Sequence, residues 1–145
     1  MSRLTTAICG LILGASIPAF AQPAGEAERK LQGTWTAAKA ERDGQAANDV
    51  AGHRLSITGN RFRIQSEDGK AIYGGTIRVD PSAKPASIDF QHSESSLKGK
   101  VWKGIYSVDG DTLTTCDNAP NMGKARPTAF EAPKGSGYVV IMFKR

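Results

Sequence analysis

"RLSITGNRFRIQSEDGKAIYGGTIRV", residues 54–79, decides the fold of this chain. Apolar and polar side chains alternate in it through three segments, a period that is typical of strands with one buried face. The segments are separated by Gly-Asn at 59–60 and by Asp-Gly at 68–69, and both dipeptides are typical of tight hairpin turns. The stretch therefore predicts three antiparallel strands joined by two short turns.

Two-residue turns at these places determine which strand residues face one another. The predicted cross-strand pairs are Ile57 with Phe62 and Ile64 with Tyr73. Because a shift of one residue would turn every side chain to the other face, the agreement of both pairs indicates one continuous apolar face.

The same alternation recurs on both sides of this stretch. Further strands are predicted over 33–40, 86–92, 100–108, 111–116 and 138–145. Eight short strands joined mostly by hairpins predict an all-β fold, an antiparallel up-and-down barrel without exposed edges. A long connection, 117–137, precedes the last strand. Two segments depart from the strand pattern: 26–30 is compatible with one helical turn, and 45–52 with a short helix.

The first residues have the pattern of a signal peptide. A basic start at Arg3 precedes an apolar run, which ends in a small-x-small cleavage pattern at 19–21. We therefore expect a signal peptide over 1–21, a lead-in over 22–30 and a lipocalin-like barrel domain over 31–145. The expected product is exported, periplasmic or secreted, with no transmembrane segment in the mature chain, because the apolar run is short for a span.

Charge and cysteine content limit the function classes. The chain has 19 Lys and Arg against 14 Asp and Glu, and this modest excess of interleaved charges argues against nucleic-acid binding. Removal of Cys9 with the signal peptide would leave Cys116 alone, so no intramolecular disulfide is expected. Two histidines without ligand spacing predict no metal, and we expect no cofactor.

Two sets of residues carry a resemblance to known families. Gly33 and Trp35 on the opening strand, with Arg145 at the chain end, resemble the lipocalin or calycin pattern, in which a basic residue packs over the indole. The second set is similar to an uncharacterised family of exported lipocalin-like domains that is numerous in planctomycetes. It comprises 31–35, 104–106, 109–113, Cys116, Arg126, Pro127, 128–129, Phe130 and 144–145. This resemblance implies the barrel fold and no established activity.

An eight-stranded barrel is either filled by side chains or holds one small ligand, and the sequence leaves both open. The side chains predicted to line the interior, and therefore to contact an apolar or amphipathic ligand, are Phe62, Ile64, Tyr73, Ile88, Phe90, Trp102 and Tyr106.

Cys116 is the remaining candidate for chemistry. A nucleophile needs a base, only His53 and His92 are available, and neighbouring Asp117 would raise the thiol pKa. If Leu113 faces inward, Cys116 faces outward. A buried structural role is therefore favoured.

The last strand is apolar on both faces, which predicts that something covers its outer face. We expect the strap, residues 117–137, to fold over the outside of the last two strands. It would bury Cys116 with Val140 and Met142 under Pro127 and Phe130, and Arg126 would bond to loop carbonyls.

Three function classes follow, in decreasing order of support. The first is a binding module for a small hydrophobic ligand. The second is an interaction or inhibitor protein that acts through its surface and the strap. The third is an enzyme, which no acid–base constellation supports. A set of outward-facing arginines is either an ordinary solvated face, which is the favoured interpretation, or a surface for an anionic envelope partner: Arg54, Arg61, Arg63 and Arg78.

Overall fold

The computed structural model describes residues 25–145, so the expected signal peptide over 1–21 lies outside the described residues. The elements are α1 (Glu26–Leu31), β1 (Gly33–Arg42), β2 (Gln45–Ala46), β3 (Arg54–Thr58), β4 (Arg61–Gln65), β5 (Ala71–Asp80), β6 (Ser87–His92), β7 (Val101–Asp109), β8 (Thr112–Asp117) and β9 (Val139–Lys144). The predicted helical turn at 26–30 is confirmed as α1. Within the described part of the chain, no helix has the length and apolar character to span a bilayer.

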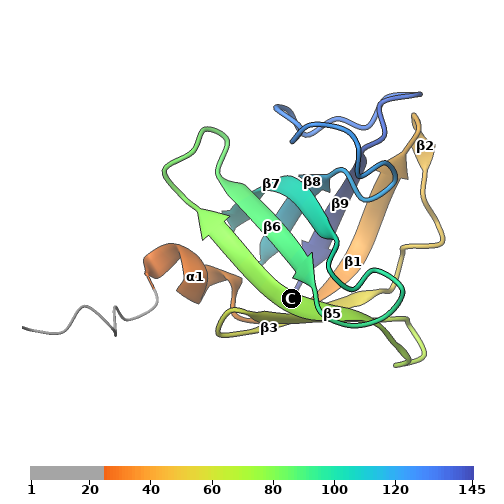
Figure 1. The fold of residues 1–145 in the computed structure, drawn as a ribbon. Coiled ribbons are helices and arrows are strands. Elements are labelled where there is room, and N and C mark those ends of the chain that lie inside the picture. The colour runs from red at the N-terminus through yellow and green to blue at the C-terminus, as the bar shows by residue number, and fades with distance from the viewer. Residues whose placement is uncertain (1–24) are drawn as a thin grey trace, which may run out of the picture.

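The strands form an eight-stranded antiparallel up-and-down barrel, as predicted (Figure 1). Each strand from β3 to β8 pairs with the next one along the chain, and β1 pairs with both β3 and β9. The β1–β9 pairing runs from Thr36 opposite Lys144 to Arg42 opposite Val139, and it closes the sheet on itself. The two-residue β2 only pairs, antiparallel, with the last two residues of β1.

The predicted register of the first hairpins is confirmed. Ile57 pairs with Phe62, and Ile64 pairs with Tyr73. The second turn is longer than predicted, however. A bulge follows Ile64, and residues 66–70 form the connection around Gly69, whose φ of 88° suits glycine. The apolar face is unaffected, because the irregularity lies at the hairpin tip.

The prediction of a short helix over 45–52 is wrong. This segment contains β2 and then a series of turns that are held against β1 by backbone hydrogen bonds. Ala47 donates to the carbonyl of Ala40, and Gly52 donates to that of Ala37, at 2.9 and 2.8 Å. Gly52 has a φ of 83°, which is not a helical conformation, so tertiary pairing overrides the local preference.

One end of the barrel is closed by α1 and the chain terminus. Leu31 and Trp35 are fully buried, and the indole N–H of Trp35 donates to the carbonyl of Leu31 at 2.9 Å. The Arg145 guanidinium lies 4.0 Å from the centre of the Trp35 ring, which confirms the predicted stacking. Arg145 also donates to the carbonyls of Gln32 and Lys30, both at 2.9 Å. It therefore links the last strand to α1 across the base.

Replacement of Arg145 by Met should lower the free energy of unfolding by about 2 kcal/mol, because a cation–π contact and two charged hydrogen bonds are lost. Urea denaturation followed by circular dichroism measures the change. Arg63→Met is the matched control, since Arg63 is exposed on the outer face of β4. It should change stability by less than about 0.5 kcal/mol. Equal effects of the two substitutions would contradict the assigned role of Arg145.

Candidate functional site

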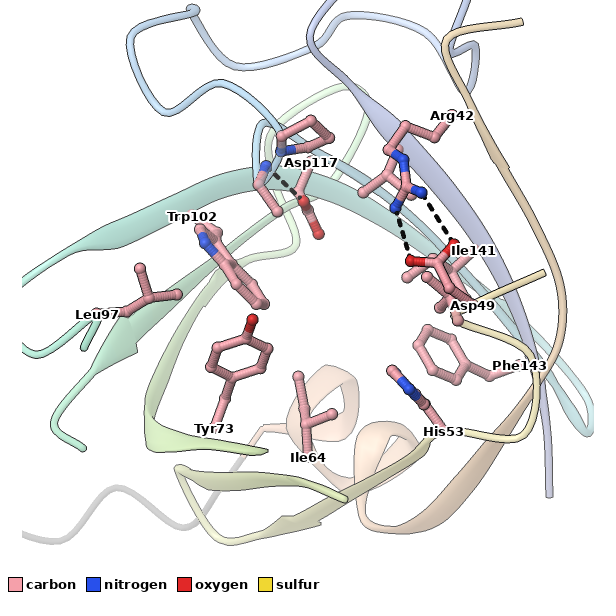
Figure 2. A pocket seen from close by; sticks show the side chains of 14 residues that line it. Arg42, Asp49, His53, Ile64, Tyr73, Leu97, Trp102, Asp117, Ile141 and Phe143 are labelled. Atoms are coloured by element: carbon pink, nitrogen blue, oxygen red, sulfur yellow. Dashed lines mark hydrogen bonds and ion pairs between the residues drawn. The ribbon is translucent and has the colours of Figure 1, made fainter. Parts of the chain in front are cut away.

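The end of the barrel opposite α1 contains a cavity of about 510 Å³ (Figure 2). Apolar and aromatic side chains from β4, β5, β7, β9 and neighbouring loops form most of its wall: Val50, Ile64, Tyr73, Leu97, Trp102, Ala119, Pro120, Val139, Ile141 and Phe143. Two basic and two acidic side chains complete the wall: Arg42, His53, Asp49 and Asp117. The barrel is therefore both filled and hollow: side chains fill its base, and the opposite end contains the cavity.

An ion pair lies at the cavity mouth. Arg42 donates two hydrogen bonds, of 2.9 and 3.2 Å, to the carboxylate of Asp49. The hydrogen bond from Arg42 lowers the pKa of Asp49. Both side chains are substantially exposed, so the pair contributes little to stability. Its two charges compensate one another.

Asp117 brings a buried carboxyl group to the same cavity. It is the last residue of β8, it is 4% exposed, and Figure 2 shows its carboxyl group directed inward. Within residues 25–145, it accepts one hydrogen bond, from the backbone N–H of Ala119 at 2.9 Å. Burial raises the pKa of Asp117 to about 7, because the charged form loses its hydration.

Two neighbours position Asp117. Gly104 on β7 is its register partner, and a Cβ at Gly104 would lie 2.9 Å from the Cβ of Asp117. Only glycine therefore allows this approach without displacement. Asn118, which follows, is fully buried, accepts from the N–H of Lys103 at 2.9 Å and donates to the carbonyl of Lys124 at 2.8 Å. These bonds fix the chain where it leaves β8.

An aromatic cluster lies next to the cavity. Its rings meet edge to face and belong to Phe62, Tyr73, Phe90, His92 and Trp102. His92 is 4% exposed, and its ring centre lies 4.2 Å from that of Trp102. Both imidazole nitrogens and the indole nitrogen of Trp102 lack a hydrogen-bond partner among the described residues. Burial lowers the pKa of His92, which favours the neutral ring.

The seven side chains predicted for the interior all belong to, or pack against, the barrel core. Ile64, Tyr73 and Trp102 line the cavity. The others do not line the cavity and belong to the packed core: Phe62, Ile88, Phe90 and Tyr106. Sequence reasoning missed Asp117, which was considered only for its effect on the thiol. The sequence could have indicated it. Successive side chains of a strand point to opposite faces, so an outward Cys116 implies an inward Asp117.

Cys116 is buried outside the core cluster, beneath the strap. Its thiol donates to the carbonyl of Glu131 at 3.6 Å, and burial raises its pKa to about 11. His53 and His92 lie on the interior side, so neither histidine serves Cys116 as a base. The expected structural role of Cys116 fits this placement.

The expected cover of β9 is only partly correct. Pro127 is buried, and Phe130 and Val140 are partly buried, whereas Met142 is 38% exposed. The strap reaches the β1–β2 turn, where Gly44 donates to the carbonyl of Ala132 at 2.7 Å. It therefore crosses β9 near its first residues and leaves Met142, nearer the base, uncovered.

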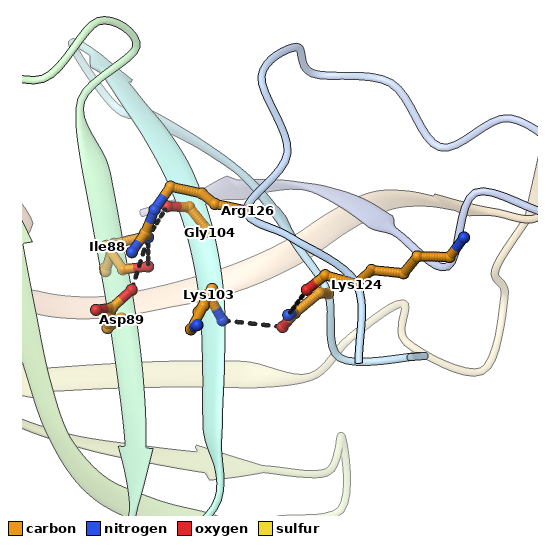
Figure 3. A network of polar contacts seen from close by, with 7 residues as sticks. Ile88, Asp89, Lys103, Gly104, Lys124 and Arg126 are labelled. Carbon is orange, nitrogen blue, oxygen red and sulfur yellow. Dashed lines mark hydrogen bonds and ion pairs between the residues drawn. The ribbon is translucent and has the colours of Figure 1, made fainter. Parts of the chain in front are cut away.

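Arg126 anchors the strap to the outer wall (Figure 3). It donates to the carboxylate of Asp89 at 2.6 Å, to the carbonyl of Gly104 at 2.8 Å and to that of Ile88 at 3.4 Å. We expected loop carbonyls as its partners, but the partners belong to β6 and β7. A long side chain on the strap reaches these strands because β7 adjoins β8 in the barrel and β6 is the next strand beyond β7.

The outward arginines have the predicted placement on β3, β4 and β5. Arg61, Arg63 and Arg78 are exposed, and Arg54 is half-buried beside the carbonyl of Glu67. No ion pair involves these four among residues 25–145. Within the same range, no three His, Cys, Asp or Glu side chains come together as metal ligands.

Comparison with known proteins found no matching family model, no matching curated protein and no matching solved structure.

Cys116 should resist a bulky maleimide in the folded protein at pH 8, because the thiol is covered by the strap and mostly protonated. The measurement is the mass increase over several hours, and the same protein in urea should be labelled within minutes. Rapid stoichiometric labelling of the folded protein would show that the strap does not cover Cys116.

Asp117 should make the wild-type protein less stable as pH rises. The unfolded carboxyl ionises near 3.8 and the folded one near 7, so the protonated folded state is favoured below this range and the advantage is lost across it. Asp117→Asn cannot ionise. Its stability relative to wild type should increase by up to about 4 kcal/mol between pH 4 and pH 8, because the folded and unfolded pKa values of Asp117 differ by about three.

Urea denaturation at both pH values measures this difference, from which the titration of His92 cancels because both proteins contain it. Asp109→Asn, at the exposed turn before β8, is the control. Its stability difference should change by less than about 0.5 kcal/mol. A pH-independent difference for Asp117→Asn would exclude a buried, protonated Asp117.

Proposed function

We propose that this protein is a binding module that holds a small apolar or amphipathic ligand in the barrel. The observation that carries the proposal is the cavity of about 510 Å³ at the end opposite α1. Small-molecule sites are typically concave, about 300–1,000 Å³ in volume, and mostly apolar with a few polar groups. This cavity has that size and that composition.

The cavity walls support specific roles for the interior residues. Ile64, Tyr73 and Trp102 would contact the ligand, with Ile141 and Phe143 opposite them (Figure 2). The remaining interior residues would support these walls as core. An apolar ligand would gain roughly 25 cal/mol for each Å² of apolar surface removed from water.

The proposal extends to the family and the location. The Trp35–Arg145 stack at the barrel base supports membership in the exported lipocalin-like family to which the sequence is similar. The signal-peptide pattern over 1–21 supports export to the periplasm or the medium. A carrier or sensor of small molecules outside the cytoplasm is consistent with both.

A second candidate function is an interaction module. The strap is fixed to the barrel and presents Met122, which is 38% exposed. The arginines of β3, β4 and β5 would offer a separate contact for an anionic envelope surface. In this case the cavity would have no ligand of its own.

Cavity-filling substitutions test the first proposal. N-phenyl-1-naphthylamine, a neutral apolar dye, should bind the wild-type protein with a dissociation constant in the micromolar range and gain fluorescence. Ile64→Trp and Ile141→Trp add bulk from two sides of the cavity, and each should weaken binding about tenfold or more. Circular dichroism establishes that the variants fold.

Ser107→Trp is the matched control, because Ser107 is exposed on the outer face of β7. It should leave dye binding within about threefold of wild type. Native mass spectrometry of protein from the exported fraction provides the independent readout, a reproducible bound mass. A clean apo mass together with no dye binding would reject the binding module and favour the interaction module.

A further inference from the structure

The charges around the cavity are not balanced. Arg42 and Asp49 at the mouth neutralise one another through their paired hydrogen bonds. His53 is the other basic side chain in the wall. Asp117 forms no ion pair within residues 25–145, since the ion pairs of this range all involve other carboxylates. When Asp117 is ionised and His53 is neutral, the cavity therefore carries a net negative charge.

Asp117 also has unused hydrogen-bonding capacity. An ionised carboxylate has about four acceptor positions on two oxygens, and Asp117 uses one of them, toward Ala119, within the described residues. Leaving a buried carboxylate incompletely paired costs free energy. A ligand that donates hydrogen bonds and carries positive charge would offset this cost, whereas an anion would increase it.

The aromatic walls favour the same kind of ligand. Tyr73 and Trp102 line one side of the cavity, and Phe143 lies opposite them (Figure 2). Aromatic faces attract cations through their quadrupoles, and their apolar surface accommodates a hydrocarbon body. The charged group of an anionic ligand would gain no such attraction.

We propose that the cavity selects amphipathic amines, whose protonated nitrogen pairs with Asp117 and whose apolar body lies against the aromatic and aliphatic walls. This inference rests on the proposed binding function and names the chemical class of its ligand. Asp117 is the residue that determines specificity. Gly104 and Asn118 act through it, since Gly104 leaves room for its Cβ and the hydrogen bonds of Asn118 fix the chain beside it.

Three probes with the same chain and different head groups test this inference. They are octylamine, octanol and octanoate, and isothermal titration calorimetry at pH 8 measures their affinities. Octylamine should bind at least about tenfold tighter than octanol, because a charge-assisted hydrogen bond is added. Octanoate should bind more weakly than octanol.

Asp117→Asn keeps the shape of the side chain and removes its charge. It should lower octylamine affinity about tenfold or more and leave octanol affinity within about threefold. Asp109→Asn removes the same charge at the opposite end of the barrel, so it should preserve the preference for the amine. Circular dichroism of each variant confirms the fold.

The outcomes separate this inference from the proposed function. A preference for octylamine that depends on Asp117 supports both. Equal binding of octylamine and octanol, tightest binding of octanoate, or an amine preference that survives in Asp117→Asn would overturn the amine inference while leaving the binding function intact. If none of the three probes binds and the neutral dye does not bind either, both proposals fail.

Discussion

The antiparallel pairing of β1 with β9 is the contact on which the rest of this structure depends. Without it, the sheet would be an open meander with two exposed edges, which are prone to pair with other chains. The pairing also brings Arg145 to Trp35, although 110 residues of sequence separate the two. Closure therefore produces a packed base, and it leaves the opposite end to be shaped by loops.

Closure also gives neighbouring residues opposite environments. Cys116 and Asp117 are adjacent in β8, but the thiol lies under the strap and the carboxyl group faces the cavity. Burial raises both pKa values, to about 11 and about 7 respectively. The consequences differ, because a protonated thiol is inert, whereas a carboxyl group that titrates near neutrality can respond to a ligand.

Several buried polar groups at the cavity end lack some or all of their hydrogen-bond partners within the described residues. Asp117 accepts one hydrogen bond, and His92 and Trp102 have nitrogens without partners among residues 25–145. Burial of such groups lowers stability unless a water or a ligand satisfies them. These groups gather in and beside one cavity, so a ligand bound there, as proposed above, would be placed to satisfy them.

The sequence by itself determined the strands, the hairpin pairs Ile57–Phe62 and Ile64–Tyr73 and the outward direction of Cys116. These follow from alternation and turn chemistry, which are local. The stacking of Arg145 on Trp35 was expected from the resemblance to the lipocalin pattern, not from any local pattern. Only the tertiary structure decided that 45–52 forms turns against β1, that the strap leaves Met142 exposed, and that the cavity lies at one end with Asp117 in its wall. The physical reason is that burial, hollow space and the partners of a charge depend on which segments meet across the closed barrel, and no local pattern specifies those distances.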